Sequence, residues 1–234
     1  MARHAGHIEQ LSDRLIWRVY HFTMHVVADH PDWQDLLLAH LEPRAGERIL
    51  ILGLGSAARA LAWAHHRPQA HFTAADPDIR ATRRARLEVE RRRIGNVEIE
   101  HLGEEPLPLK TASVDAVFSY LATAHLSRSS KATLHRECLR VLRRRGRWLL
   151  ACLDAPQEPG EMVASILVRA TYGGGARAPE DEIPSGREAA TEGGLKFRRL
   201  AVFCAPRARV ALFSARKLGS ARPEISAEKT GSRP

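Results

Sequence analysis

The sequence predicts an open, doubly wound α/β domain, in which helices cover a mostly parallel sheet of seven strands. Three observations support this prediction. After Pro43, short apolar runs alternate with longer stretches of helical period, a glycine turn follows the first apolar run, and an acidic residue follows the second. Apolar runs separated by helical stretches are typical of parallel strands, because the crossover helices bury both faces of such a sheet.

The expected elements follow from this alternation in chain order. Strands of the parallel part are expected at Ile49–Leu52, His71–Ala75, Val97–His101, Val114–Ser119 and Arg147–Cys152. Helices between them are expected at Ser56–His66, Pro77–Arg93 and Lys131–Arg143. Two further strands, Phe197–Cys204 and Arg209–Ala215, complete the sheet.

The regions outside this alternation define the expected domain organisation. Residues 1–42 carry apolar side chains at spacings of three and four, which predicts amphipathic helices that form a lid. Residues 43–218 are expected to form the α/β domain, within which residues 154–194 are a long substrate-facing segment with a helix near Met162–Tyr172. Residues 219–234 are rich in Ser, Pro, Lys, Glu and Gly and are expected to be disordered.

The composition is that of an ordinary globular domain, with 44% hydrophobic and 27% charged residues in a chain of 234. The net charge is +9, but only five of the 36 basic residues are Lys. We interpret this skew as arginine spread over the whole surface, so nucleic acid is not the expected partner. Three scattered cysteines show neither a disulfide framework nor metal-ligand spacing, which favours the cytoplasm.

The sequence also bears on contact with membranes. No apolar stretch approaches the roughly 20 residues that a membrane span needs, and the first residues lack a signal-peptide pattern. Peripheral contact with a membrane surface stays open, because Trp17, Tyr20 and Trp33 lie in the amphipathic N-terminal region.

The glycine turn Gly53-Leu54-Gly55 and the acid Asp76 are the sharpest local features. Glycine permits a tight turn and close approach of a ligand to the backbone, while the following helix offers unpaired N–H groups. Asp76 lies 23 residues after Gly53, where a carboxylate can accept hydrogen bonds from ribose hydroxyls. An ordinary turn and a helix N-cap are the simpler explanations of the same residues.

Two classes of adenosine cofactor suit this pattern, since a dinucleotide fold also carries a glycine turn with a downstream acid. A short-chain dehydrogenase would be expected to place a lysine four residues after a catalytic tyrosine. None of the three tyrosines is followed by lysine at that spacing, and the chain has no second catalytic domain. A dehydrogenase is therefore the weaker alternative.

Five segments, in order, resemble the core of the class I S-adenosylmethionine-dependent methyltransferases over residues 47–153. They are Glu47–Ala57 (ERILILGLGSA), Asp76-Pro77-Asp78, His101–Leu109, Ser113–Ser119 with His125-Leu126, and Glu137–Gly146. The resemblance is to the methyltransferase domain of the ubiquinone- and menaquinone-biosynthesis-like type. It implies a Rossmann-like fold, an enzyme that transfers a methyl group, and S-adenosyl-L-methionine as cofactor.

The resemblance also assigns roles to individual residues. It implies that Gly53, Leu54 and Gly55 contact the methionine moiety and that Asp76 and Pro77 lie at the ribose. Adenine would be met by Leu102, Glu104 and Glu105, and the methionine side near the sulfonium would be lined by Ser119 and Tyr120. His125 is the candidate catalytic base for an acceptor that must lose a proton. No metal is expected, because the pair His65-His66 lacks a third ligand at useful spacing.

Two residues near the glycine turn depart from the family pattern, and they suggest an alternative to the expected function. Ile51 stands where the family has an acid, and Ala57 stands where it has a third glycine. The expected function is methyl transfer to a small molecule, apolar or amphipathic, held by the N-terminal helices and residues 154–194. The departures favour one alternative, a catalytically inactive binding or partner subunit. An RNA methyltransferase ranks last, because the arginines between Arg83 and Arg93 have no aromatic residues among them for stacking bases.

Overall fold

The computed structural model describes residues 31–53, 55–76, 79–103, 106–122, 128–154, 157, 195–205 and 208–217. Its helices are α2 (Pro31–Leu41), α3 (Ser56–His66), α4 (Ile79–Arg92) and α5 (Arg128–Val141). Its strands are β1 (Arg48–Leu52), β2 (His71–Asp76), β3 (Val97–His101), β4 (Val114–Tyr120), β5 (Leu142–Leu153), β6 (Arg198–Ala205) and β7 (Ala208–Arg216). Among these described residues, no helix has the length and apolar character needed to cross a membrane.

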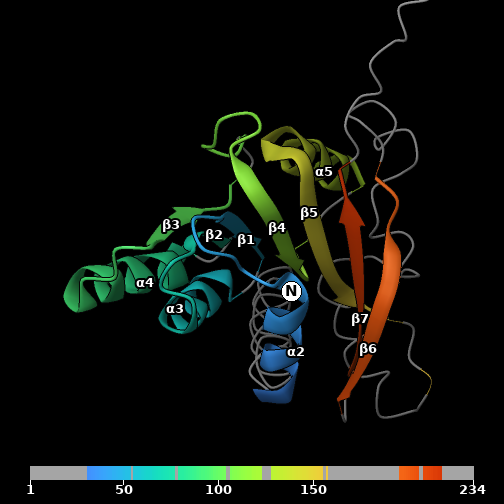
Figure 1. Cartoon of the computed structure of the whole chain (residues 1–234), viewed down its shortest axis with the longest axis horizontal. Coiled ribbons are helices and arrows are strands. Elements are labelled where there is room, and N and C mark those ends of the chain that lie inside the picture. The colour runs from blue at the N-terminus through green and yellow to red at the C-terminus, as the bar shows by residue number, and fades with distance from the viewer. Residues whose placement is uncertain are drawn as a thin grey trace, which may run out of the picture.

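The strands form one sheet in the order β3-β2-β1-β4-β5-β7-β6 (Figure 1). Strands β1 to β5 run parallel, and β7 lies antiparallel to both β5 and β6. The expected seven-stranded, mostly parallel sheet is therefore confirmed. Because the chain moves outward from β1 to β3 and then returns to β4, the strand order reverses between β1 and β4. Ligands of open α/β sheets bind at such a switch point, outside the carboxyl ends of the strands.

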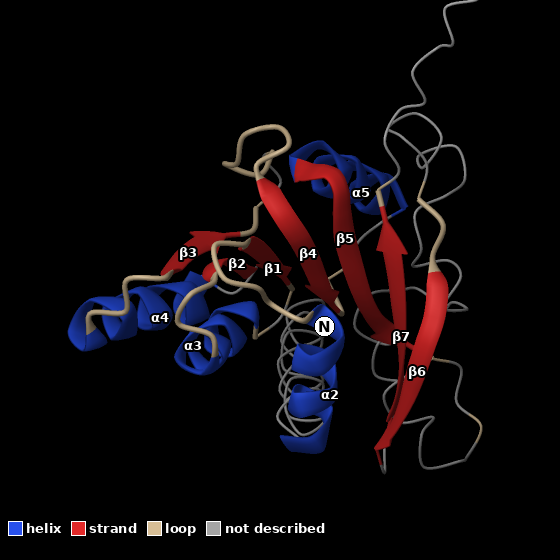
Figure 2. Ribbon diagram, in the orientation of Figure 1, coloured by secondary structure: helices blue, strands red, loops and turns tan. Residues whose placement is uncertain are grey.

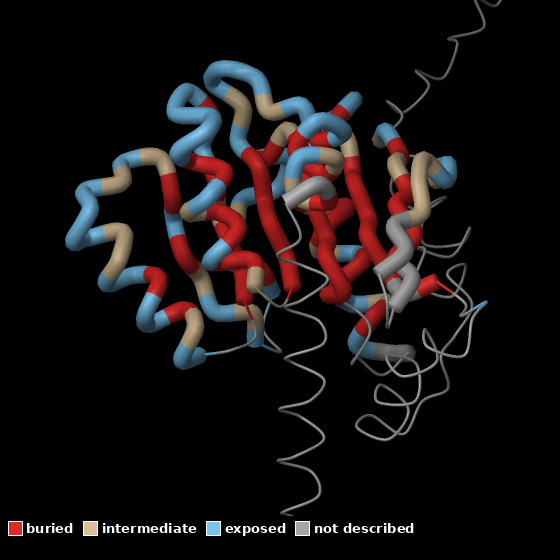
Figure 3. The backbone as a smooth tube through the Cα atoms, turned by 90° about the horizontal axis from the view of Figure 1, so that it is seen from below, coloured by how far each residue is buried: buried red, intermediate tan, exposed pale blue. Residues whose placement is uncertain are grey.

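Two apolar clusters pack on opposite faces of the sheet, and Figure 3 shows the strands buried while the helices are exposed on their outer sides. One cluster joins α2, α3 and α4 to residues such as Ile51 and Phe118, and the other joins α5 to Leu50 and Trp148. Helix α2 belongs to the first cluster, since Trp33 and Leu37 are completely buried. This part of the expected lid region therefore contributes to the core of the domain.

Arg147 on β5 fastens α2 to the sheet. Its guanidinium donates to both carboxylate oxygens of Glu47, at 2.7 and 2.6 Å, and to the carbonyl oxygens of Leu41 and Glu42, at 2.8 and 3.0 Å. These two carbonyls lie at the end of α2, where backbone acceptors have no partner within the helix. The hydrogen bonds from Arg147 hold the pKa of the Glu47 carboxyl below its ordinary value.

The second face of β2 and β3 is not covered by a helix in the described part of the chain (Figure 2). Near the start of these strands the residues pointing to that face are polar, namely His71, Thr73 and Glu98, whereas their neighbours Phe72 and Val97 are buried against α3 and α4. Among the described residues, helices therefore cover both faces of the sheet at β4 and β5, and one face at β2 and β3. Successive side chains of a strand point to opposite faces, so apolar residues alternate with polar ones where helices cover one face.

Candidate functional site

Gly53 ends β1 in a conformation that few other residues adopt, with φ at +109°. Its N–H donates to the carbonyl oxygen of Ala75 at 3.2 Å. A Cβ at this position would lie 2.1 Å from the carbonyl oxygen of Tyr120 and 3.1 Å from Ala122. Glycine is thus required at position 53 because the end of β4 crosses over it.

Gly55 has a different reason to be glycine. Its φ of +74° places it in the left-handed region, but a Cβ there would meet no atom within 4 Å. It is the N-cap of α3, makes no side-chain capping bond, and is followed by a first turn without an acid. The turn therefore leaves open space beside a helix N-terminus that has a partial positive charge and backbone donors to offer.

Asp76 ends β2 beside this turn. The Ser56 hydroxyl donates to its Oδ2 at 3.5 Å, and the Leu102 N–H donates to its carbonyl oxygen at 3.0 Å. The structure therefore brings Gly53, Gly55, Asp76 and Leu102 together at the carboxyl ends of β1, β2 and β3. The Asp76 side chain is completely buried, so a ribose that binds it must displace the groups that cover it.

Ser119 and Tyr120 end β4, beside β1, but their side chains point to opposite faces of the sheet. The Ser119 hydroxyl accepts a hydrogen bond of 3.0 Å from the Trp148 indole N–H. The Tyr120 ring packs under the Arg59 guanidinium, whose carbon lies 4.2 Å from the ring centroid. Both side chains are almost fully buried, so it is the backbone of β4 that adjoins the glycine turn.

Comparison with known proteins fits this geometry. Residues 49–146, which carry the glycine turn and Asp76, match the family model described as a methyltransferase domain. Residues 49–146 are a methyltransferase domain. It is of the class I, S-adenosylmethionine-dependent type that the sequence predicts, so the family, the enzyme class and the cofactor are confirmed. The finer ubiquinone- and menaquinone-biosynthesis-like type stays a prediction. None of the curated proteins matches the chain in sequence.

Solved structures share the fold of this methyltransferase domain at low sequence identity. The YcgJ protein from Bacillus subtilis is 18% identical with a TM-score of 0.60, covering 81% of this chain and 100% of its own. A SAM-dependent methyltransferase from Aquifex aeolicus is 15% identical with a TM-score of 0.56, covering 85% and 98%. Geranyl diphosphate C-methyltransferase from Streptomyces coelicolor is 13% identical with a TM-score of 0.59, covering 80% of each chain.

Five of the candidate site residues lie outside the described residues. They are Leu54, Pro77, Glu104, Glu105 and His125. Their roles toward the methionine, the ribose, the adenine and the acceptor stay predictions.

The two departures from the family pattern are absorbed by packing. Ile51 and Ala57 are 0% and 1% exposed, and both belong to the apolar cluster under α2 and α3. Both side chains therefore belong to the apolar core of this methyltransferase domain, while Gly53 and Gly55 keep the positive φ angles of the turn.

Two residues near the site escaped the sequence-based prediction. Ser56 bonds Asp76, and its only signal was its place directly after Gly55. Arg59 is 5% exposed, lies over the rings of Trp63, Phe118 and Tyr120, and donates to Gln34 Oε1 at 3.4 Å. Its signal was an arginine one turn before Trp63 on an otherwise apolar helix face.

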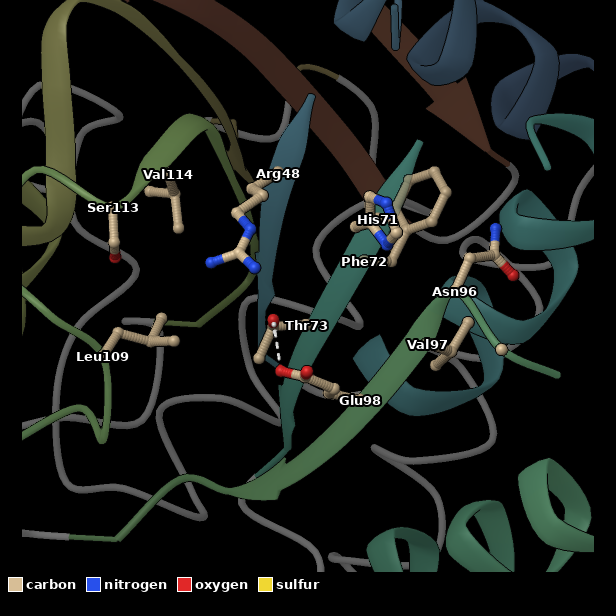
Figure 4. A pocket seen from close by; sticks show the side chains of 11 residues that line it. Arg48, His71, Phe72, Thr73, Asn96, Val97, Glu98, Leu109, Ser113 and Val114 are labelled. Carbon is tan, nitrogen blue, oxygen red and sulfur yellow. Dashed lines mark hydrogen bonds between the residues drawn. The ribbon is translucent and has the colours of Figure 1, made fainter. Parts of the chain in front are cut away.

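A small hollow at the opposite edge of the sheet is unsuited to the cofactor (Figure 4). It opens over the first residues of the strands, among them Arg48, His71 and Thr73, and its volume is about 70 Å³. Sites for small molecules enclose roughly 300–1,000 Å³. Thr73 and Glu98 also bond each other across it, at 3.5 Å.

Proposed function

We propose that this chain transfers the methyl group of S-adenosylmethionine to a small-molecule acceptor. The observation that carries the proposal is the open turn at Gly55 next to the Asp76 carboxylate, at the switch point between β1 and β4. Because Gly55 has no Cβ, a ligand can approach the backbone closely, and the backbone N–H groups suit the amino-acid end of the cofactor. The buried acid suits its ribose.

The residues present can share the work of binding. Gly55 and the first N–H groups of α3 would hold the methionine moiety, and Asp76 would accept hydrogen bonds from the ribose hydroxyls. Ser56 would orient the Asp76 carboxylate through the bond it already makes. S-adenosylmethionine supplies a methyl group that its sulfonium has already activated. The chain's main task is therefore to fix the direction of approach of the acceptor.

The acceptor we propose is apolar or amphipathic. In support, geranyl diphosphate C-methyltransferase shares the fold, and its structure holds geranyl diphosphate, a small amphipathic molecule. The segments expected to form the acceptor pocket, with Trp17, Tyr20 and Tyr172, lie outside the described residues. The cytoplasm is the compartment we propose, since Cys138 and Cys152 are free and buried, and burial raises the pKa of the Cys138 thiol.

Calorimetric titration with S-adenosylmethionine and with S-adenosylhomocysteine tests the cofactor site. Asp76→Asn should bind both about thirtyfold more weakly, because hydrogen bonds to a charged group contribute about 2 kcal/mol. Asp115→Asn is the matched control. It makes the same chemical change on β4 at the far edge, where Asp115 accepts bonds from the Arg48 N–H and the Arg143 guanidinium. Equal affinities of the two variants would contradict the proposed site.

A catalytically inactive binding subunit is the second candidate, favoured by the absence of exposed surface on Asp76. It predicts that neither ligand produces heat or raises the melting temperature at millimolar concentration. Formation of S-adenosylhomocysteine from S-adenosylmethionine with a mixture of prenylated phenols and quinols, measured by mass spectrometry, would exclude this candidate.

A further inference from the structure

The outer face of α4 combines positive charge with exposed apolar side chains. The helix packs beside β3 at one end of the sheet, and its inner residues Thr82 and Ala85 are buried (Figure 1). It contains six arginines and two glutamates. At about 100° of rotation per residue, all four of these exposed arginines fall within one arc of about 100° on the helix surface: Arg80, Arg83, Arg84 and Arg91.

Leu87 lies in the middle of this arginine face. It follows Arg80 and Arg83 by seven and four residues, and it is 66% exposed. Ile79, in the first turn, is 43% exposed. Among the described residues, these are the two exposed large hydrophobic side chains, and both lie on α4. Their joint position next to the arginines sets this helix apart from α5, whose exposed residues include Arg136 but no large apolar side chain.

Part of the positive charge on α4 is available to a partner, because two of its six arginines form no ion pair with any described residue. Arg91 and Arg92 pair with Glu88, and Arg86 pairs with Glu100 at 3.3 Å. Arg83 and Arg84 form no ion pair with any described residue. Glu90 is the one exposed acid that borders the face.

We propose that the outer face of α4 docks this protein on an anionic lipid surface. Arginines attract lipid phosphates, and a leucine among them can enter the boundary between headgroups and acyl chains. A nucleic acid is the poorer match, because α4 has no aromatic residue on which a base can stack and a leucine gains little from phosphates. This docking is independent of the proposed methyl transfer.

Sedimentation with lipid vesicles tests the docking. The wild-type chain should bind phosphatidylcholine vesicles in which about one lipid in three is phosphatidylglycerol, and should bind pure phosphatidylcholine vesicles at least about tenfold more weakly. Binding should fall as salt is raised. Arg83→Gln with Arg84→Gln should reduce binding to the anionic vesicles at least about tenfold, and Leu87→Gln about threefold.

A second pair of arginines gives the matched control. Arg136→Gln with Arg144→Gln removes the same charge from exposed positions on α5 and β5, and should change vesicle binding less than about twofold. Circular dichroism and melting temperatures identify any variant that fails to fold. An equal loss in the control pair, equal binding to neutral vesicles, or no effect of Leu87→Gln would each overturn the proposal. Displacement of the protein from the vesicles by single-stranded RNA, with loss of RNA binding in Arg83→Gln with Arg84→Gln, would identify nucleic acid as the partner instead.

Discussion

The two edges of the sheet are built on different principles. At the carboxyl edge, Gly53 and Gly55 adopt positive φ angles, a 3.5 Å bond links Ser56 to Asp76, and the Gly55 turn has open space beside it. At the amino edge, the guanidinium groups of Arg140 and Arg147 each bond a carboxylate and two backbone carbonyls, an arrangement we call an arginine fork. These bonds are 2.6 to 3.1 Å long. In the function proposed above, the Gly55 turn and the buried Asp76 bind the ligand, whereas the arginine forks stabilise the fold.

A second fork shows how the amino edge is held. Arg140 on α5 donates to the carbonyl oxygens of Leu107 and Leu109 and to both oxygens of Glu137, which in turn accepts from the Leu107 N–H. Residues 106–113, the described part of the chain that leads into β4, contain no helix and are thereby fixed to α5. Each fork satisfies backbone groups that would otherwise lose their partners on folding.

The largest effect is expected at Gly53. Gly53→Ala should lower the free energy of unfolding by about 4 kcal/mol, because its Cβ would meet the Tyr120 carbonyl oxygen and because a φ of +109° is strained for alanine. Gly55→Ala, with open space around it, should cost only about 1 kcal/mol for its left-handed φ. Urea unfolding followed by tryptophan fluorescence measures both.

The affinity for S-adenosylmethionine should depend more on Gly55 than on Gly53, the reverse of their effect on stability. Folded Gly55→Ala should lose affinity, because its methyl group enters the space assigned to the cofactor. If Gly55→Ala unfolds more readily than Gly53→Ala and binds S-adenosylmethionine normally, the assignment of Gly55 to the ligand and Gly53 to packing is wrong.

The next effect is expected at the amino edge. Arg147→Gln should destabilise the fold by about 3 kcal/mol, because two carbonyls at the end of α2 lose their guanidinium donor and the Glu47 carboxylate keeps only its bond from the Arg44 N–H. Arg145→Gln, an exposed change nearby, should stay within about 0.5 kcal/mol. Affinity for S-adenosylmethionine in the folded Arg147→Gln variant should match the wild type, since the proposed cofactor site is at the other edge. A loss of affinity without a loss of stability would contradict the separation of roles.

The two edges also differ in how far the sequence predicts them. Strand β3 and helix α3 have the predicted bounds, because apolar runs and the glycine turn mark them locally. Strand β5 begins at Leu142, five residues before the predicted start, since Leu142 pairs with Val114 ahead of a bulge. A pairing of that kind depends on a neighbouring strand and leaves no local pattern.

The candidate site shows the same limit. The sequence identifies Gly53, Gly55 and Asp76, but the steric reason for Gly53 lies in Tyr120 and Ala122, which are distant in the chain. The hydrogen bond between the Ser119 hydroxyl and the Trp148 indole likewise depends on how β4 and β5 pair. Residue type and spacing predict which groups gather at an edge. Which way a side chain points is decided by packing against other elements.

The smallest predicted effect concerns acid stability, and it comes from two carboxyls that the arginine forks of the amino edge hold. Hydrogen bonds from Arg147 and Arg140 lower the pKa of the Glu47 and Glu137 carboxyls from an ordinary value of 4.5. A carboxyl whose pKa is lowered by folding stabilises the native state fully above its unfolded pKa. That contribution is lost as the pH falls below 4.5 and through the lowered value, because the unfolded chain then binds the proton first.

Urea unfolding at pH 7 and at pH values below 4.5 should therefore show that the free energy of unfolding falls on the acid side, with a contribution from each of these carboxyls. Arg147→Gln should remove the contribution of Glu47, so that the free energy of unfolding falls less steeply as the pH is lowered. Asp76→Asn should leave the contributions of the two glutamates unchanged. An acid loss that disappears in Asp76→Asn but persists in Arg147→Gln would mean that the carboxyl edge, rather than the arginine forks, sets the acid stability of the fold.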